Sequence, residues 1–361
     1  MRLRLTVRGF ALACAAVALG IAAYWTLQSA LLVPAVLAGG VVVAGLVLLL
    51  VAPAGRDVEW SPPAVAAEGV DLDVPVRLPS AYVGGWWRPQ TSLDPVTFSW
   101  DRLEDAQTAL RVFAPHRGVH RLGPVRVRRR DPLGAWLSTR RLDALGELVV
   151  GPRVTPLAAS AVLGHGIDAS SSRIGQGDLV DQIVRDYRAG DPVRRIHWRQ
   201  TARHGSLMVR QEQPPATPRV VIVLDTLAEG WRDDDELDEG VRAFASLCLA
   251  VAGQGLQVEV RETGAAQLDE DRIQGRTALL DACARLEPTR VLADRGGVGI
   301  GVQGPALVVA GLGSPSLRRL VADLAPGSTV WSVTDDERTV PRQVRHMRWD
   351  GGHPYEVRRS R

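Results

Sequence analysis

Lysine and asparagine are absent from this 361-residue sequence, and cysteine occurs only three times. All 43 residues in the lysine-plus-arginine total are therefore arginine, a bias of the whole chain that is typical of a GC-rich genome. The cysteines, Cys14, Cys248 and Cys283, are far apart and form no Cys-x-x-Cys pair, which excludes a disulfide framework and a zinc knuckle. With 40 acidic residues the net charge is only +3, which argues against a polybasic nucleic-acid-binding protein.

The remaining composition is that of a folded chain. Hydrophobic residues make up 46% and charged residues 23% of the sequence, so it can bury a sizeable core. The length predicts two domains and leaves room for a third. Composition by itself indicates no function.

Two long apolar stretches, residues 7–27 and 31–51, dominate the N-terminal region, and Arg8 is the one charged residue within them. Each is 21 residues long, which at about 1.5 Å per residue spans roughly 31 Å, the thickness of a hydrocarbon core. Because only a short turn separates them, residues 1–56 are expected to form a transmembrane helical hairpin. The alternative is a cleaved signal peptide, but a second full-length apolar run directly after the first favours the hairpin.

Arginine predicts the orientation of this hairpin. Arg2 and Arg4 precede the first stretch, Arg8 lies at its start and Arg56 follows the second, while the turn carries no charge. The positive-inside rule therefore predicts a multi-pass cell-membrane protein with both termini in the cytoplasm and the lipid bilayer as one of its partners.

Residues 57–156 show the short alternating patterns of β-strands. Strands are expected at residues 71–78, 95–100, 108–113 and 147–150, with turn signals at 117–118, 123–124 and 131–132. Several short strands separated by glycine and proline predict a small all-β sandwich. The basic run Arg126, Arg128, Arg129 and Arg130 is interpreted as a solvated face or as an edge that faces lipid headgroups. Residues 157–184, rich in serine, glycine and alanine, are expected to be a flexible linker.

The densest motif follows this linker. Asp191 is a suitable N-cap, Pro192 suits the first helical position and Gly205 suits the position after the last turn, so a helix is predicted over residues 192–204. Arg195, Arg199 and Arg203 are spaced four apart and share one face of that helix. Like charges at this spacing oppose helix formation, so the stripe is expected to meet something anionic.

Three partners for this arginine stripe remain open. One is the acidic run of the same chain at residues 233–239; the second is an acidic patch on a partner protein; the third is the anionic inner leaflet. Nucleic acid is less favoured, because no basic patch with interleaved aromatic residues extends beyond the helix. His197 and His204 are expected to have packing or surface roles, since no nucleophile or paired carboxylate has a fitting spacing.

At this point the chain resembles a known family. The string RDYRAGDPVRRIHW at residues 185–198, with TAR at 201–203 and LMVR at 207–210, is similar to the signature of bacterial domain-of-unknown-function family 58. The resemblance implies a membrane protein often encoded beside a MoxR-type AAA+ ATPase, with a von Willebrand factor A-like domain and no established catalytic activity. The signature residues are predicted to bind the partner: Arg185, Tyr187, Gly190, Asp191, Arg194, Arg195, His197, Trp198, Arg199 and Arg203.

From residue 219 onwards strands and helices alternate. Strands are expected at residues 219–226, 256–260, 306–310 and 329–333, and helices at 237–252, 277–286 and 316–324. This alternation predicts a parallel α/β sheet, so residues 185–340 are interpreted as the signature helix plus a von Willebrand A-like domain. Cys248 and Cys283 are expected to be buried, and residues 341–361 a mobile basic tail.

The resemblance also implies a metal site, which this sequence does not keep. In a von Willebrand A-like domain, an aspartate such as Asp225 would begin an Asp-x-Ser-x-Ser loop that holds a divalent cation. Leu227 and Glu229 occupy the two serine positions here, and only Thr277 would correspond to a further ligand. We therefore expect a degenerate site without metal or cofactor, in which Asp225 caps the following turn.

The leading prediction is a non-enzymatic, membrane-anchored scaffold or adaptor whose cytoplasmic domain binds a protein, with a MoxR-type AAA+ ATPase as the partner that the resemblance implies. The first alternative is a divalent-cation-dependent ligand-binding module that uses Asp225 and Thr277. The second is a hydrolase that uses His197 with Asp191 or Asp186, which is disfavoured because neither a nucleophile nor a metal is evident.

Overall fold

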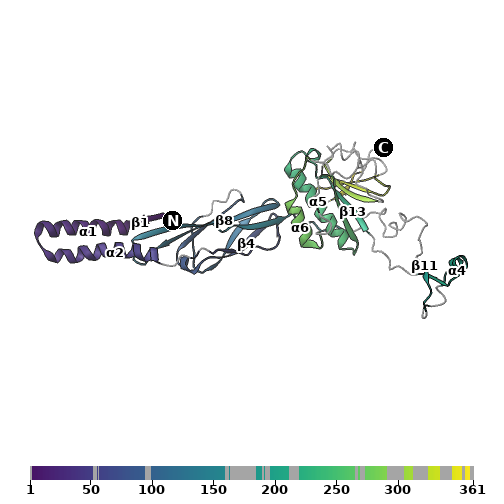
Figure 1. The fold of residues 1–361 in the computed structure, drawn as a ribbon. Helices are drawn as coiled ribbons and strands as arrows, with labels where there is room; N and C mark the ends of the chain where they lie inside the picture. The colour runs from purple at the N-terminus through teal and green to yellow at the C-terminus, as the bar shows by residue number, and fades with distance from the viewer. Residues whose placement is uncertain are drawn as a thin grey trace. The chain divides into compact units, whose positions relative to one another are not determined.

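The computed structural model describes residues 2–51, 55, 57–93, 99–158, 162, 184–188, 191, 196–210, 219–264, 267–268, 273–290, 305–311, 324–333, 344–351 and 354–357. The chain divides into two compact units, Met1–Gly151 and Pro152–Arg361, which are described separately (Figure 1).

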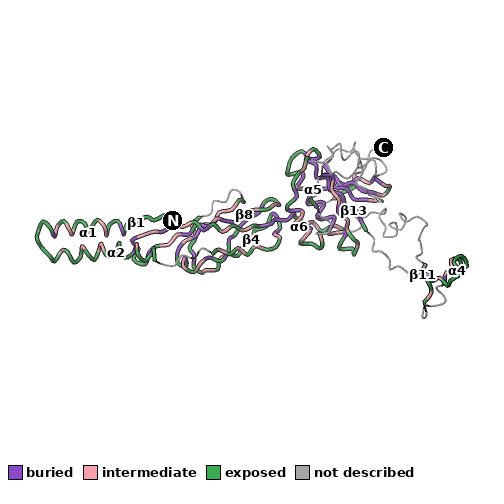
Figure 2. Tube along the Cα trace, viewed as in Figure 1, coloured by how far each residue is buried: buried purple, intermediate pink, exposed green. Residues whose placement is uncertain are grey.

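The first unit begins with a helical hairpin. Helix α1 covers Val7–Thr26, the short helix η1 covers Ser29–Leu31, and α2 covers Leu32–Val51. Both long helices are long and apolar enough to span a membrane, as predicted. Most of their residues are exposed (Figure 2). An exposed apolar surface of this extent is expected of helices that face lipid rather than water.

Two β-sheets follow in the same unit and share one hydrophobic core. Buried residues of both sheets, such as Val74 and Leu110 of the smaller and Val127 and Leu148 of the larger, belong to one cluster. The smaller sheet has the order β2-β4-β7, and the larger has the order β1-β9-β8-β10-β3 with β5 and β6 added beside β8. The strands are β1 (Arg2–Leu5), β2 (Glu59–Trp60), β3 (Ala66–Ala67), β4 (Asp71–Arg77), β5 (Trp86–Thr91), β6 (Asp101–Arg102), β7 (Gln107–Phe113), β8 (Gly118–Arg130), β9 (Trp136–Leu142) and β10 (Gly146–Gly151), with the short helix η2 at Ser80–Tyr82.

The strands predicted near residues 71–78, 108–113 and 147–150 are present as β4, β7 and β10. The strand predicted at 95–100 falls mostly outside the described residues. The turn predicted at Gly123-Pro124 is wrong, because β8 continues through a cis peptide bond there. Before this point β8 pairs with β10, and after it β8 pairs with β9, so a proline without an N–H lies where the strand changes its partner.

The N-terminal arginines were expected only as a flank of the hairpin, but they form strand β1. Arg2 pairs with Thr139 and Arg4 with Leu137, antiparallel to β9. Directly after β1, the Thr6 hydroxyl donates to the Gly134 carbonyl at 2.6 Å. These contacts tie the start of α1 to the β8–β9 turn.

The second unit contains a six-stranded sheet with the order β14-β13-β15-β16-β17-β18. The first five of these strands are parallel to their neighbours, and β18 is antiparallel. The elements are β13 (Arg219–Leu224), η5 (Ala228–Gly230), α5 (Asp234–Ala252), β14 (Gln257–Glu262), α6 (Arg276–Arg285), β15 (Ala306–Ala310), β16 (Thr329–Ser332), β17 (Arg345–Arg348) and β18 (Tyr355–Glu356).

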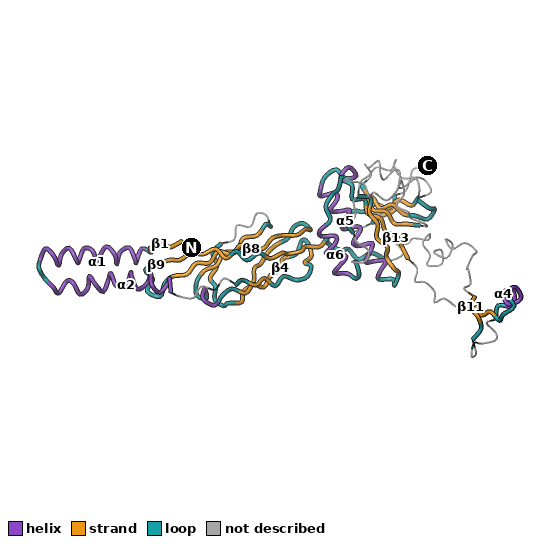
Figure 3. The backbone as a smooth tube through the Cα atoms, viewed as in Figure 1, coloured by secondary structure: helices purple, strands orange, loops and turns teal. Residues whose placement is uncertain are grey.

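Both faces of this sheet are buried, as the continuous apolar strands predict. Alternate residues of β13 belong to two clusters: Ile222 and Leu224 pack with α5 and α6, while Val223 packs with Val308 and Val330 on the other face. Helices α5 and α6 therefore cover one face (Figure 3). Cys248 and Cys283 are buried in the first cluster, and burial raises the pKa of the Cys248 thiol. The helix predicted over residues 316–324 lies mostly outside the described residues.

The prediction of a mobile basic tail at residues 341–361 is wrong for residues 344–351, and part of that range lies outside the described residues. Arg345–Arg348 form β17, which extends the parallel sheet beside β16. Met347 and Trp349 are buried in the core, where the ring of Trp349 lies 6.4 Å from that of Trp331. These apolar side chains outweigh the arginines that suggested a tail, because burial of a tryptophan and a methionine stabilises the strand by more than surface charges oppose it.

The flexible linker predicted at residues 157–184 also lies mostly outside the described residues. Leu157 and Val162, however, pack into the α/β core, and Val162 is fully buried. The Thr155 N–H donates to the Ser246 hydroxyl of α5 at 3.0 Å. The start of the predicted linker is thus attached to the α/β sheet.

Candidate functional site

The signature residues form a two-stranded ribbon with a short helix. Strand β11 (Val184–Asp186) pairs antiparallel with β12 (Met208–Arg210), and helix α4 covers Trp198–His204. Arg185 lies on β11 opposite Val209, and the Tyr187 N–H donates to the Leu207 carbonyl. Gly190, Arg194 and Arg195 lie outside the described residues.

Helix α4 is shorter than the pattern predicts, and its predicted start is wrong. Ile196 forms a β-bridge with Val209, and the His197 N–H donates to the Met208 carbonyl, so Ile196 and His197 belong to the ribbon and not to the helix. His197 then acts as the N-cap, since its Nδ1 accepts from the Gln200 N–H at 3.3 Å. Asp191 instead closes a turn, where its carboxylate accepts from the Arg188 N–H. The predicted end at Gly205 is present, in the left-handed conformation.

Two members of the arginine stripe, Arg199 and Arg203, lie exposed on α4, next to Trp198, whose exposed fraction is 64%. Neither arginine forms an ion pair with any residue of the described ranges. Helix α4 therefore presents two cations and a large aromatic ring to solvent.

The two histidines of this region have local roles. His197 caps α4, and His204 lies 3.3 Å from the Gln200 carbonyl through its Nδ1. Asp186 accepts from the Ser206 hydroxyl. Within the described part of the chain, both side chains make hydrogen bonds to the backbone of Gln200 and neither contacts a carboxylate, so the geometry offers no support for the hydrolase alternative.

The second candidate site is Asp225, at the carboxyl end of β13. Since β14 and β15 lie on opposite sides of β13, this is the topological switch point at which ligands of parallel sheets bind. Asp225 is fully buried, and its Oδ1 accepts from the Thr263 hydroxyl at 2.5 Å and the Leu227 N–H at 3.2 Å. Its Oδ2 has no hydrogen-bond partner among the described residues. Burial raises the pKa of the Asp225 carboxyl, against the opposing effect of these two hydrogen bonds.

This arrangement does not fit a divalent cation. Hard cations are held by several oxygen ligands that include ionised carboxylates, whereas burial favours the neutral form of Asp225. Thr277 lies exposed on the first turn of α6, and the partner of Asp225 is Thr263. The loop after β13 also packs tightly against the strand ends. The Trp231 Nε1 donates to the Asp225 carbonyl. The backbone of Gly230 lies so close to Gly311 that a Cβ on Gly311 would be 2.2 Å from the Gly230 carbonyl oxygen.

Sequence reasoning missed Thr263 as the partner of Asp225. It directly follows β14, which lies beside β13 in a parallel pair, so both residues leave the sheet at the same edge. The rule that the carboxyl ends of parallel strands meet at one edge was sufficient to find it.

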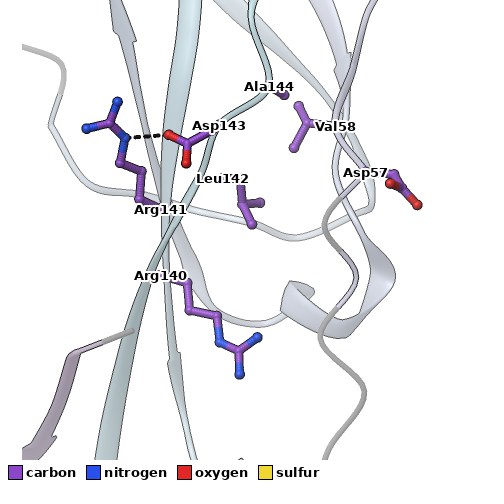
Figure 4. A pocket seen from close by; sticks show the side chains of 7 residues that line it. All are labelled: Asp57, Val58, Arg140, Arg141, Leu142, Asp143 and Ala144. Atoms are coloured by element: carbon purple, nitrogen blue, oxygen red, sulfur yellow. Dashed lines mark hydrogen bonds and ion pairs between the residues drawn. The ribbon is translucent and has the colours of Figure 1, made fainter.

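A pocket of about 730 Å³ lies in the first unit, lined by Asp57, Val58, and residues 140–144. Figure 4 shows the Arg141 side chain directed toward Asp143, and the two form an ion pair at 2.6 Å. The lining carries no cysteine, serine or histidine, so it offers no thiol, hydroxyl or imidazole group.

The comparison with protein families identifies the ribbon and the first part of the sheet. Residues 183–266 match the model of a family described as protein of unknown function DUF58. This segment is therefore similar to the DUF58 family. The match confirms the resemblance seen in the sequence, and it covers β11, α4, β12, β13, α5 and β14, with both Asp225 and Thr263.

A relative of the chain is the uncharacterized protein YeaD of Bacillus subtilis (strain 168). The two are 28% identical over 147 residues, which cover 39% of this chain and 36% of YeaD. The alignment thus spans about a third of that relative's length, and the relative's name carries no activity. Neither the family description nor the name of this relative gives a function.

Proposed function

We propose that this protein is a non-enzymatic, membrane-anchored adaptor, and that the exposed face of α4 in its DUF58 region binds a protein partner in the cytoplasm. Its α/β unit would be a von Willebrand A-like domain, and the partner a MoxR-type AAA+ ATPase, as the family resemblance implies. The observation that carries the proposal is the exposure of Trp198 beside Arg199 and Arg203. Tryptophan and arginine are the residues most enriched where binding energy is concentrated in protein interfaces.

The intramolecular alternative for the arginines is weakened by the contacts of the acidic run. Asp233 caps α5 by accepting from the Glu236 N–H. Glu236 in turn accepts from the Arg232 N–H, and Glu239 pairs with Arg242. These three carboxylates have partners within the α/β unit, which favours an external anion for the α4 arginines.

The hairpin supplies the anchor. Two antiparallel apolar helices joined by the three-residue helix η1 leave both ends of the hairpin on the same side of a bilayer. The flanking arginines favour the cytoplasm as that side by the positive-inside rule. Protease added to the outer face of intact cells should therefore leave the bulk of the chain uncut, and digestion of the bulk would refute this orientation.

Crosslinking in native membranes tests the partner proposal. The wild-type chain should recover an AAA+ ATPase, and R199E/R203E should lose it while keeping the thermal unfolding midpoint of the wild type. The matched control is R232E/R276E, which reverses two arginines of the α/β unit outside α4 and should retain the partner. Loss of the partner in both double variants, or recovery of no ATPase by the wild type, would contradict the proposal.

A further inference from the structure

The outer face of the larger β-sheet of the first unit is strongly basic. On β8, Val125 and Val127 are buried in the core between the sheets, so the alternating residues Arg126, Arg128 and Arg130 lie on the opposite face. The strand registers place residues of the neighbouring strands on that same face. The resulting arginine face consists of Arg2, Arg4, Arg88, Arg102, Arg126, Arg128, Arg130 and Arg141.

Little negative charge balances the arginine face. Arg141 pairs with Asp143 at 2.6 Å, but the other members form no ion pair with the residues that the structure describes. The pKa of Arg128 is lowered, first by burial and then by the charges of Arg4 and Arg88. Arginines from three strands thus lie close enough to repel one another.

Aromatic rings hold part of the arginine face in place. The Arg128 guanidinium lies 3.9 Å from the centre of the Trp100 ring, and that of Arg130 lies 5.3 Å from the Trp86 ring. Such stacking orders a guanidinium without neutralising its charge, and its N–H groups remain available to an anion. The face is therefore ordered as well as charged.

The arginine face begins at the base of the helical hairpin. Arg4 precedes the first residue of α1 by three positions. It pairs with Leu137 of β9, and Arg130 of β8 pairs with the same residue from the other side, so the three residues form one row across the sheet. A strand rises about 3.3 Å per residue, so this row lies within roughly 10 Å of the helix start and the row of Arg2 and Arg128 within roughly 17 Å. A headgroup layer is about 6 Å thick and its potential extends about 8 Å further, which brings the first row into range and leaves the second row just beyond it.

We propose that the arginine face binds the anionic phospholipid headgroups of the leaflet at the base of the hairpin. This contact goes beyond the adaptor function, because it involves the first unit rather than the DUF58 region. Phosphate groups match guanidinium geometry, and the nearest surface available to Arg4 and Arg130 is the bilayer itself. An acidic protein or a nucleic acid would have to reach the same residues within a headgroup's distance of the membrane.

Lipid titration of the full-length chain tests this proposal. The protein is purified in a nonionic detergent and titrated with phosphatidylglycerol or with phosphatidylcholine of the same acyl chains, and bound lipid is counted by native mass spectrometry. Phosphatidylglycerol should bind at least tenfold more tightly than phosphatidylcholine. Each neutralised arginine should weaken its binding by about fivefold, so R4Q/R130Q should remove most of the preference.

The matched control is R77Q/R111Q, which neutralises two exposed arginines of the smaller sheet and should leave the preference unchanged. If R4Q/R130Q has a lower unfolding midpoint than the wild type, R2Q/R4Q on the edge strand β1 replaces it. Equal binding of the two lipids, or wild-type binding by the stable variant, would overturn the proposal. Tighter binding of polyglutamate or of a DNA oligonucleotide than of phosphatidylglycerol would also overturn it.

Discussion

Replacement of Trp349 by alanine tests whether the C-terminal residues are a structural strand. The side chain is only 2% exposed, its ring lies 6.4 Å from that of Trp331, and its Nε1 donates to Glu239 on α5. Truncation of a buried tryptophan costs about 3–5 kcal/mol, from lost burial plus the cavity that remains. In a unit of about 200 residues each kcal/mol lowers the midpoint by roughly 2–4 °C, so W349A should unfold roughly 6–20 °C earlier.

The assay is thermal unfolding of the full chain in detergent, followed by intrinsic fluorescence. W349F keeps most of the apolar contact but loses the hydrogen bond to Glu239, so its loss should be only about 1–2 kcal/mol. R345Q, which removes only the half-exposed pair with Glu356, should cost at most about 1 kcal/mol. If W349A unfolds within a degree of the wild type, the packing of β17 against the core is wrong, and a mobile tail is the better description.

Further predictions concern the β8 crossover, the buried carboxyl and the hairpin base. G123A should destabilise the first unit by roughly 1–3 kcal/mol or more, because Gly123 has a φ of +91° and a Cβ would lie 2.0 Å from the Ala144 oxygen. G134A, whose φ is +75° with no atom within 4 Å of its Cβ, should cost less in the same unfolding assay. Because the pKa of Asp225 is raised in the folded state, its contribution to stability is full at low pH and is lost as the pH rises through the folded-state value. The unfolding midpoint of D225N should therefore depend less on pH above about 4 than that of the wild type. Mg²⁺ should leave the midpoints of both proteins unchanged. A Mg²⁺-induced rise in the wild-type midpoint that D225A abolishes would revive the cation-binding alternative. W136F should cost about 1 kcal/mol in thermal unfolding, since Trp136 donates to the Val42 carbonyl of α2 at 2.8 Å, and no change would mean that this bond is absent in solution.

Elements with a strong local signal could be predicted from the sequence. The hairpin helices and α5 have long apolar or periodic patterns, and β13 and β15 are continuous apolar runs with buried faces. Each of these signals depends on residues within the element itself. Their boundaries differ from the expected ones by only a few residues, because the patterns extend over the whole element.

Elements that depend on distant partners could not be predicted. Strand β1 is stabilised by β9, more than 130 residues away, and has no pattern of its own in four residues. The start of α4 was misplaced for the same reason: Asp191 and Pro192 are good local helix signals, but Ile196 pairs with Val209 across the ribbon and keeps the chain extended. A β-bridge to a residue 13 positions later is a tertiary contact that competes with local capping, and here it is the stronger of the two.

The location of the DUF58 match separates the two proposed contacts. Residues 183–266 include α4 with Arg199 and Arg203, but exclude β1, β8 and the whole arginine face. A binding activity common to chains that match this family must rest on the ribbon and the first β-α-β unit of the sheet, because these are the elements that the match contains. Lipid contact through Arg4 and Arg130 is under no such constraint and belongs to the unit that carries the hairpin. R199E/R203E should therefore lose the protein partner and keep lipid selectivity, R4Q/R130Q should do the reverse, and a variant that loses both would show that the two contacts are coupled.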